Sequence, residues 1–501
     1  MVSETMKNET ELIETEKPEM GAASPSGRWS RFALSWGSLI GVFACGLIFL
    51  KMSGPLRDNS LFTHIATGRF IVENGYVPSG DIYTYTAEGA PWVVQSWGVS
   101  TLYALLEGVF GPVGIRALAG AVGVALFALL WVFSRPLNLL PRTALIGALT
   151  ISGMLFFGPR PTIFGFLFLV VTLLAARGDI PAFTLTPVAF MWVNMHGSWP
   201  TGFAVLVVLA AAALLDRVSP LVTVRATAFF VVGVAVAALG PLGLDGVTFP
   251  YSMLQRQDVL GYIVEWQRPS PFSLATIFLW FLLLLAVAGW FRNRSWRSAA
   301  LIVFSVLLGF SVFRNIPVAS LILFFPIVDG WRGVGRDIGR RRSPAATAVG
   351  WVAAAVFMVG GVAGQQNWDY SAYPVAATDQ MEAWGWMENP EVRVAGALVA
   401  GNYWSLRYGP DHKILHDDRF DMYDRALIER FMLFNDEDRT PAERRAAIES
   451  FNPDVVVWNE EKDYLLEALA ESDDWREIRR YDDGWLILCR VSSTSTPCSS
   501  L

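Results

Sequence analysis

The sequence predicts a mainly α, polytopic membrane protein with about eleven helical spans and a small C-terminal α/β domain outside the membrane. Three observations lead to this prediction. The 501 residues are 53% hydrophobic and only 17% charged, which is too apolar for an ordinary soluble globule. Apolar windows long enough to cross about 30 Å of hydrocarbon recur along the first three quarters of the chain. After Gly364, short β-like runs alternate with helix-like stretches instead.

The polar N-terminal stretch, residues 1–31, is rich in Glu, Lys, Pro and Ser, and we predict a disordered cytoplasmic tail there. It lacks the short basic start and nearby small-residue cleavage site of a secretory signal, so we expect an uncleaved first span to follow. Residues 32–364 then form the predicted transmembrane domain, which includes a first external loop at 51–112. The predicted spans are 32–50, 113–133, 143–158, 161–176, 181–195, 199–215, 224–242, 272–291, 297–313, 315–330 and 345–364.

The distribution of Lys and Arg gives the predicted orientation of these spans, because both residues prefer cytoplasmic loops. Five basic connectors alternate with connectors poorer in Lys and Arg, so they must share one face. They are RPLNLLPR ending at Arg142, ARGD at 176–179, DRVSPLVTVR at 216–225, FRNRSWR at 291–297 and WRGVGRDIGRRR at 331–342. We expect a multi-pass protein of the inner (plasma) membrane with a cytoplasmic N-terminus and an extracytoplasmic C-terminal domain.

The stretch at 97–110, WGVSTLYALLEGVF, decides whether this orientation holds. It is short and amphipathic, and Glu107 interrupts it. If it crossed the membrane, one end of the protein would be inverted relative to the basic connectors. We therefore predict a helix that lies at the membrane interface within the external loop.

This topology gathers unusual ionisable residues on the outer face. Such groups are costly at membrane depth and are therefore candidates for a functional site. The residues concerned are Asp58, His64, Arg69, Asp81, Arg160, His196, Glu265, Arg268 and Arg314. Their convergence predicts a single polar cavity that opens outward.

The C-terminal part is predicted as an α/β domain at 365–495 with a short tail at 496–501. The β-like runs are KILH (413–416), DVVVW (454–458) and WLILC (485–489), and the helix-like stretches are ALIERFMLF (426–434) and KDYLLEALAE (462–471). The domain is acidic and would not attract anionic phosphates, so we expect a scaffold or acceptor-binding role and no nucleic-acid partner. Cys489 and Cys498 could pair or stay free.

Fingerprints of soluble enzymes are missing from the sequence. It contains no Walker loop, no GxGxxG motif after a strand, no CxxC and no HExxH. A nucleotide-driven pump and a zinc protease therefore have no support.

The first loop, RDNSLFTHIATGRFIVENGYVPSGDIYTYTAEGAPWVVQSWG, resembles that of polytopic bacterial glycosyltransferases of the GT-C superfamily. The segments RPTIFGF (160–166), WVNMHGSWPTG (192–202) and DDRFDMYD (417–424) fit the same group. The resemblance implies transfer of a sugar from a polyprenyl-phosphate donor in the bilayer to a glycan, lipid or protein acceptor at the outer face.

The resemblance also implies roles for the outer residues. Asp58 matches the acidic residue of the first external loop, and its carboxylate could accept the proton of an attacking hydroxyl. Asp81 and His64 are further catalytic candidates. Arg160 and Arg314 are predicted to hold the lipid phosphate, since a guanidinium matches phosphate oxygens. The remaining substrate-binding candidates are Arg69, His196, Glu265 and Arg268.

One departure bears on metal binding. Members of the group often carry two acids separated by one residue, whereas this chain has Asp58, Asn59 and Ser60. A divalent metal is therefore not supported by the sequence, and we expect no cofactor.

Most candidates also have a purely structural interpretation, as four of them illustrate. Asp58 could form a solvated ion pair with Arg57, His64 could be a satisfied interfacial histidine, and Asp81 could organise a turn. Arg160 could simply snorkel to the interface. For the whole protein, the alternative function is a transporter or flippase of a lipid-linked or anionic substrate, and a third possibility is an assembly protein that acts through its external domain.

Overall fold

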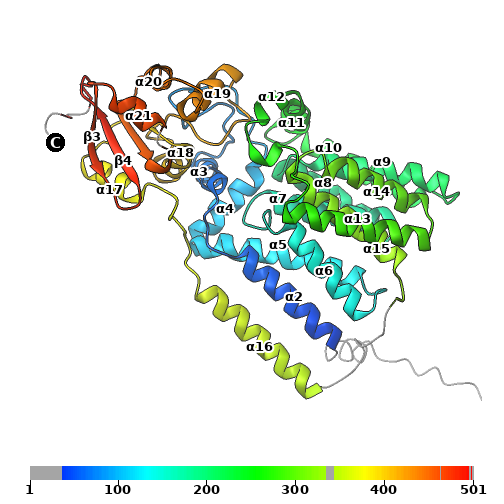
Figure 1. The fold of residues 1–501 in the computed structure, drawn as a ribbon. Helices are drawn as coiled ribbons and strands as arrows, with labels where there is room; N and C mark the ends of the chain where they lie inside the picture. The colour runs from blue at the N-terminus through cyan, green and yellow to red at the C-terminus, as the bar shows by residue number, and fades with distance from the viewer. Residues whose placement is uncertain (1–35, 335–343, 463, 496–497, 499–501) are drawn as a thin grey trace, which may run out of the picture.

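A computed structural model describes residues 36–334, 344–462, 464–495 and 498, so the predicted tail at 1–31 lies outside the described residues. The described chain is mostly helical. Figure 1 shows a bundle of long helices at one end of the molecule and the sheet with its helices at the other, with α3 and α4 between them.

The bundle consists of the apolar helices. They are α2 (Trp36–Met52), α5 (Pro112–Phe133), α6 (Leu139–Gly153), α7 (Thr162–Arg177), α8 (Leu185–Met195) after the 3-10 turn η1 (Ala182–Thr184), α9 (Trp199–Leu215), α10 (Leu221–Ala237), α13 (Leu274–Arg292), α14 (Trp296–Gly309), α15 (Ile316–Gly330) and α16 (Pro344–Ala363). Every predicted span overlaps one of them. Between α10 and α13 lie α11 (Gly243–Gln255), α12 (Gln257–Leu260) and the 3-10 turn η2 (Val264–Trp266), and η3 (Phe313–Asn315) precedes α15.

Three stretches of the described chain are long and apolar enough to cross a membrane: Pro112–Phe133, Leu274–Arg292 and Phe313–Gly330. The other predicted spans coincide with shorter apolar helices of 10–17 residues. The apolar, helical character of the bundle is thus confirmed, and the number of helices that cross stays a prediction.

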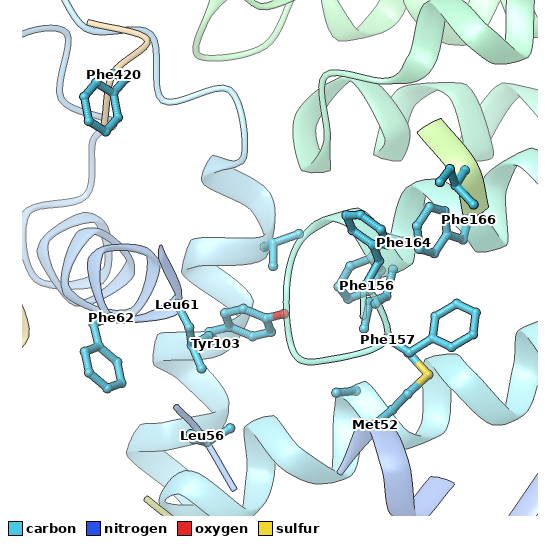
Figure 2. Close-up of a cluster of buried hydrophobic side chains, with 14 of the residues drawn as sticks. Met52, Leu56, Leu61, Phe62, Tyr103, Phe156, Phe157, Phe164, Phe166 and Phe420 are labelled. Atoms are coloured by element: carbon cyan, nitrogen blue, oxygen red, sulfur yellow. The ribbon is translucent and has the colours of Figure 1, made fainter. Parts of the chain in front are cut away.

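The first loop forms two packed helices, α3 (Asn59–Asn74) and α4 (Trp97–Phe110). They approach so closely that a Cβ atom at Gly68 would collide with the Ser100 carbonyl oxygen, so this position requires glycine. The stretch 97–110, predicted as an interfacial helix, is thus a helix that packs against α3. Figure 2 shows Phe62 of α3 and Tyr103 of α4 in a buried cluster with Phe156 and Phe157 from the connection before α7.

A buried arginine near the start of α5 fixes the ends of the neighbouring segments. Arg116 Nε donates to the Ser53 carbonyl oxygen at 2.7 Å, and its Nη atoms donate to Asn367 Oδ1 at 2.7 Å and Gln365 Oε1 at 3.0 Å. Because Ser53 follows α2 while Gln365 and Asn367 follow α16, this side chain joins both helices to α5 at the base of the first loop.

The C-terminal part is built on a four-stranded sheet in the order β1-β2-β4-β3. The strands are β1 (Val394–Gly396), β2 (Val455–Asn459), β3 (Trp475–Arg480) and β4 (Trp485–Arg490). The helices are α17 (Val375–Ala383), α18 (Leu398–Tyr408), α19 (Arg425–Met432), α20 (Pro441–Glu449) and α21 (Tyr464–Ala470), with 3-10 turns η4 (Leu433–Asn435) and η5 (Glu460–Lys462). β1 and β2 are parallel, and the other two pairings are antiparallel.

Two of the three predicted strand runs are confirmed, since DVVVW overlaps β2 and WLILC overlaps β4. The strand predicted at KILH is wrong. Ile414 forms only isolated bridges, because its backbone N–H donates to the Tyr83 carbonyl oxygen at 2.9 Å and its carbonyl accepts from the Tyr85 N–H at 3.0 Å. This segment therefore pairs only through Ile414, with Thr84 of the first loop and with Val394 of β1, and not along its length. Cys489 of β4 and Cys498 form a disulfide, a pairing that the sequence left open.

Candidate functional site

Asp58 stands immediately before α3, in extended backbone with φ −79° and ψ 129°. Its carboxylate makes no capping hydrogen bond to the helix. One oxygen, Oδ1, accepts from Ser60 Oγ at 2.7 Å, and the other, Oδ2, accepts from the guanidinium of Arg160. The carboxylate therefore joins the first turn of α3, through Ser60, to the bundle, through Arg160.

Arg160 is presented by the short connection between α6 and α7. Pro159 and Pro161 flank it in the sequence, and their fixed φ angles restrict the backbone on both sides. Its Nε and Nη2 atoms contact Asp58 Oδ2, while Nη1 donates to Glu265 Oε1 at 2.5 Å. We call Asp58, Arg160 and Glu265 the Arg160 cluster.

Electrostatics favour the charged form of this arginine. Burial opposes its charge, but the carboxylates of Asp58 and Glu265 outweigh burial and raise the pKa of Arg160. Because all three guanidinium nitrogens contact carboxylates, the arrangement disfavours the predicted binding of a lipid phosphate by Arg160.

Glu265 belongs to η2, and this turn lies against η3. The Phe313 N–H donates to the Gln267 carbonyl oxygen at 2.8 Å, which joins the two turns. The guanidinium of Arg314 lies 4.6 Å from the ring centroid of Trp266, a cation–π contact. Arg314 thus stands beside the Arg160 cluster and makes no hydrogen bond or ion pair with the described residues.

Both predicted outer histidines lie near these charges. His64 Nδ1 is 3.0 Å from Ser100 Oγ, and burial lowers the pKa of His64 to about 4 against the raising effect of Asp58. His196 Nδ1 is 2.7 Å from Ser198 Oγ, and burial together with Arg314 and His64 lowers the pKa of His196 to about 3. Both rings are therefore neutral at pH 7. A neutral imidazole can donate one hydrogen bond and accept another without adding charge to the site.

Three of the predicted site residues, Arg69, Arg268 and Asp81, lie apart from the Arg160 cluster. Arg69 forms a bidentate pair with Glu107 at 2.8 and 2.9 Å and donates to the Leu406 carbonyl oxygen at 3.0 Å, so it joins α3, α4 and α18. It lines a groove of about 420 Å³ between α3 and α4, which Asp58 does not line. Arg268 is exposed and forms no ion pair with the described residues.

Asp81 belongs to a buried network between the first loop and the C-terminal part. Its carboxylate accepts from the backbone N–H groups of Tyr83 and Thr84 at 3.1 Å and from Arg419 Nη2 at 2.7 Å. Arg419 also binds the buried Asp417 at 2.7 Å. The turn-forming interpretation of Asp81 agrees with these contacts, which join segments distant in the sequence.

Sequence reasoning gave no role to two residues that the C-terminal part places next to Asp58. Asn402 of α18 donates to Asp418 Oδ1 at 2.5 Å and to Thr63 Oγ1 at 2.8 Å, so the Asp418 carboxylate is held against the start of α3. Asp418 falls within the DDRFDMYD segment quoted above, which was the only signal for it, whereas nothing marked Asn402.

Asp418 has an unusual electrostatic environment. Burial and the neighbouring Asp417 carboxylate raise the pKa of Asp418 to about 7, against the lowering effect of the Asn402 hydrogen bond. The charge of Asp58 acts in the same raising direction. Two carboxylates from opposite ends of the chain thus influence each other at this site.

Solved structures with a similar arrangement come from Archaeoglobus fulgidus. Its oligosaccharyltransferase, tethered through a disulfide to an acceptor peptide containing the NVT sequon, matches with a TM-score of 0.52 and 13% identity over 92% of this chain and 75% of the enzyme chain. The same enzyme in complex with Zn and sulfate matches with a TM-score of 0.50 and 11% identity, over 90% and 73% of the two chains.

The chain has the GT-C fold. The resemblance predicted from the first loop is therefore confirmed at the level of fold, and the protein is a membrane protein of this architecture. No family model and no curated protein matches the sequence.

The zinc in the second GT-C structure raises the question of whether the site of this chain fits a divalent cation. Among the described residues no group of three or more His, Cys, Asp or Glu side chains is arranged to hold a metal. The two acids nearest Arg160, Asp58 and Glu265, are both ion-paired to it. The side chains present do not fit a metal ion.

Proposed function

We propose that this protein is a membrane glycosyltransferase that moves a sugar from a polyprenyl-phosphate donor to an acceptor at the outer face. The observation that carries the proposal is the meeting of Asp58, Arg160, Glu265 and Arg314 at the ends of four separate connections of a GT-C fold. The structural neighbours are oligosaccharyltransferases by name, which supports the same reaction class.

Arg314 is the residue that we assign to the lipid phosphate. Its guanidinium is adjacent to the Arg160 cluster but keeps its hydrogen-bond donors free of the described residues. As the bond between sugar and phosphate breaks, negative charge accumulates on the leaving phosphate. A fixed guanidinium stabilises that charge, and such preorganised charge is a large contribution to catalysis.

The acceptor approaches from the side of the C-terminal part. In this proposal the Asp58 carboxylate orients the attacking hydroxyl or amide, and its contact with Arg160 holds it in one position. Asp418 lies nearby with a pKa of about 7, which suits a group that accepts a proton near neutral pH. The proton released by the acceptor therefore has two carboxylates within the site to receive it.

Two further observations support the outer location. Asp58, Arg160, His196, Glu265 and Arg314 lie on connections that the basic-residue pattern assigns to the outer face. The disulfide between Cys489 and Cys498 is a feature of oxidising compartments. Both favour a reaction outside the cytoplasm.

The test is turnover of polyprenyl-phosphate sugars by the purified protein in lipid nanodiscs, with wild type beside Asp58→Asn and the exposed-site control Arg268→Ala. We expect donor consumption by wild type and by the control, and none by Asp58→Asn. Donor binding without turnover in all three proteins would contradict the proposal and indicate a transporter or flippase.

A further inference from the structure

The Arg160 cluster places a single cation between two carboxylates. The guanidinium contacts Asp58 Oδ2 through Nε and Nη2 and Glu265 Oε1 through Nη1. Asp58 comes from the start of the first loop, and Glu265 comes from the connection before α13. Without a cation between them the two like charges would repel each other.

Arg160, which carries this cation, is held firmly in position. Its backbone lies between two prolines, and its Cα is carried directly before α7, whose first turn begins at Thr162. The side chains of Arg160, Asp58 and Glu265 keep only 30%, 17% and 34% of their exposure. Partial burial strengthens the attraction between the three charges relative to a fully solvated pair.

A metal ion between Asp58 and Glu265 would compete with Arg160 for carboxylate oxygens. Divalent cations such as Mg²⁺ and Mn²⁺ bind carboxylate oxygens, and Asp58 Oδ2 and Glu265 Oε1 are both occupied by Arg160. Asp58 Oδ1 already accepts from Ser60, which stands where a second acid would strengthen such a site. An ion at this point would also face the positive charge of Arg160.

We propose that Arg160 is the resident cation of this site and takes the place of a divalent metal, so that the site binds no metal ion. Arg160 is in this sense a positioning residue, because it fixes the Asp58 carboxylate and the η2 turn in one arrangement. The inference concerns the site of the proposed glycosyltransferase and rests on that function for its role in catalysis, but its metal-binding content can be tested without any turnover.

The experiment is a titration with Mn²⁺ of the purified full-length protein in nanodiscs of neutral phosphatidylcholine, followed by electron paramagnetic resonance. We expect wild type to bind no Mn²⁺ at this site. Arg160→Asp removes the cation and adds a third carboxylate between Asp58 and Glu265. Its affinity for Mn²⁺ should rise at least about 100-fold, because a local repulsion becomes an attraction.

The matched control is the double variant Arg160→Asp with Asp58→Asn, which should lose the gained binding. Arg160→Lys should stay metal-free like wild type. If Arg160→Asp does not fold, Arg160→Ala provides the same comparison with a smaller expected gain, since it only frees the two acids.

Two results would overturn the inference. One is Mn²⁺ binding by wild type that Asp58→Asn abolishes. The other is a folded Arg160→Asp variant that binds no more Mn²⁺ than wild type. Failure of sugar transfer by the wild type would count against the proposed function instead, and would leave the binding results as the measure of this inference.

Discussion

Asn402 and Asp418 hold each other in a reciprocal pair. The Asn402 side-chain amide donates to Asp418 Oδ1 at 2.5 Å, and the Asp418 backbone N–H donates to Asn402 Oδ1 at 3.1 Å. The same amide reaches Thr63 Oγ1 in α3, so the pair fixes the C-terminal part against the residues that follow Asp58. The C-terminal part therefore contributes a carboxyl group to the candidate site, where the sequence suggested only a scaffold or an acceptor-binding domain.

Asp418→Asn tests whether that carboxyl group accepts a proton. Since the pKa of Asp418 is raised to about 7, transfer by wild type should rise as the pH passes through about 7 and the carboxylate form appears. The variant should lose this part of the pH profile and most of its activity. The measurement is donor turnover between pH 5.5 and 8.5, and an unchanged profile in the variant would contradict the role.

Stability should respond to the same substitution in the opposite direction. The pKa of Asp418 in the folded chain lies above its ordinary value of 3.8, so the folded state holds the proton more tightly and stability falls as pH rises from about 4 through about 7. At pH 8 the Asp418→Asn protein should therefore melt at a higher temperature than wild type, while at pH 4 the two should differ little. Thermal unfolding at both pH values gives the comparison.

Asp81→Asn separates a structural role from a catalytic one. The substitution leaves the buried Arg419 with one carboxylate partner fewer, which should lower stability by about 2 kcal/mol. Turnover per folded molecule should stay near that of wild type. Thermal unfolding and turnover of the same preparation provide the measurement, with the exposed Asp411→Asn as the control. Loss of turnover at an unchanged melting temperature would instead make Asp81 a catalytic residue.

Arg314→Ala tests the assignment of the lipid phosphate. We expect a rise in the KM for the polyprenyl-phosphate donor of at least about tenfold, because a charge-assisted contact contributes about 1.5 to 3 kcal/mol, with little change for the acceptor. Arg268→Ala, which removes an exposed arginine without an ion pair to the described residues, is the matched control. Equal effects of Arg314→Ala on donor and acceptor would argue against the assignment.

Labelling of single cysteines tests the predicted orientation. In a Cys45→Ser background, a cysteine replacing the exposed Asp411 should react with a membrane-impermeant maleimide on intact cells. One replacing the exposed Asn293, in a basic connector, should react only after permeabilisation. Reaction of both in intact cells would show that α13 and α14 do not lie as the basic pattern predicts.

Local sequence patterns predict the apolar helices and assign the site residues to one face of the membrane. Apolar windows are a local property of the chain, so each predicted span coincides with an apolar helix. The alternation of basic connectors is likewise visible in the sequence alone. It assigns Asp58, Arg160, Glu265 and Arg314 to one side. The helix at 97–110, also predicted from the sequence, is α4.

Which of these residues meet depends on the packing of the helices. Arg160 is 102 residues from Asp58 and 105 from Glu265, and Asp81 is 338 residues from Arg419. Contacts over such separations depend on how helices pack, which no local pattern specifies. Asn402 and the short strand β1 were missed for this reason. The β-like run KILH makes only single bridges, from Ile414 to the first loop and to β1, because of how these segments pack. Hydropathy is a local property and predicts which segments are apolar helices, whereas packing determines which charges neutralise one another.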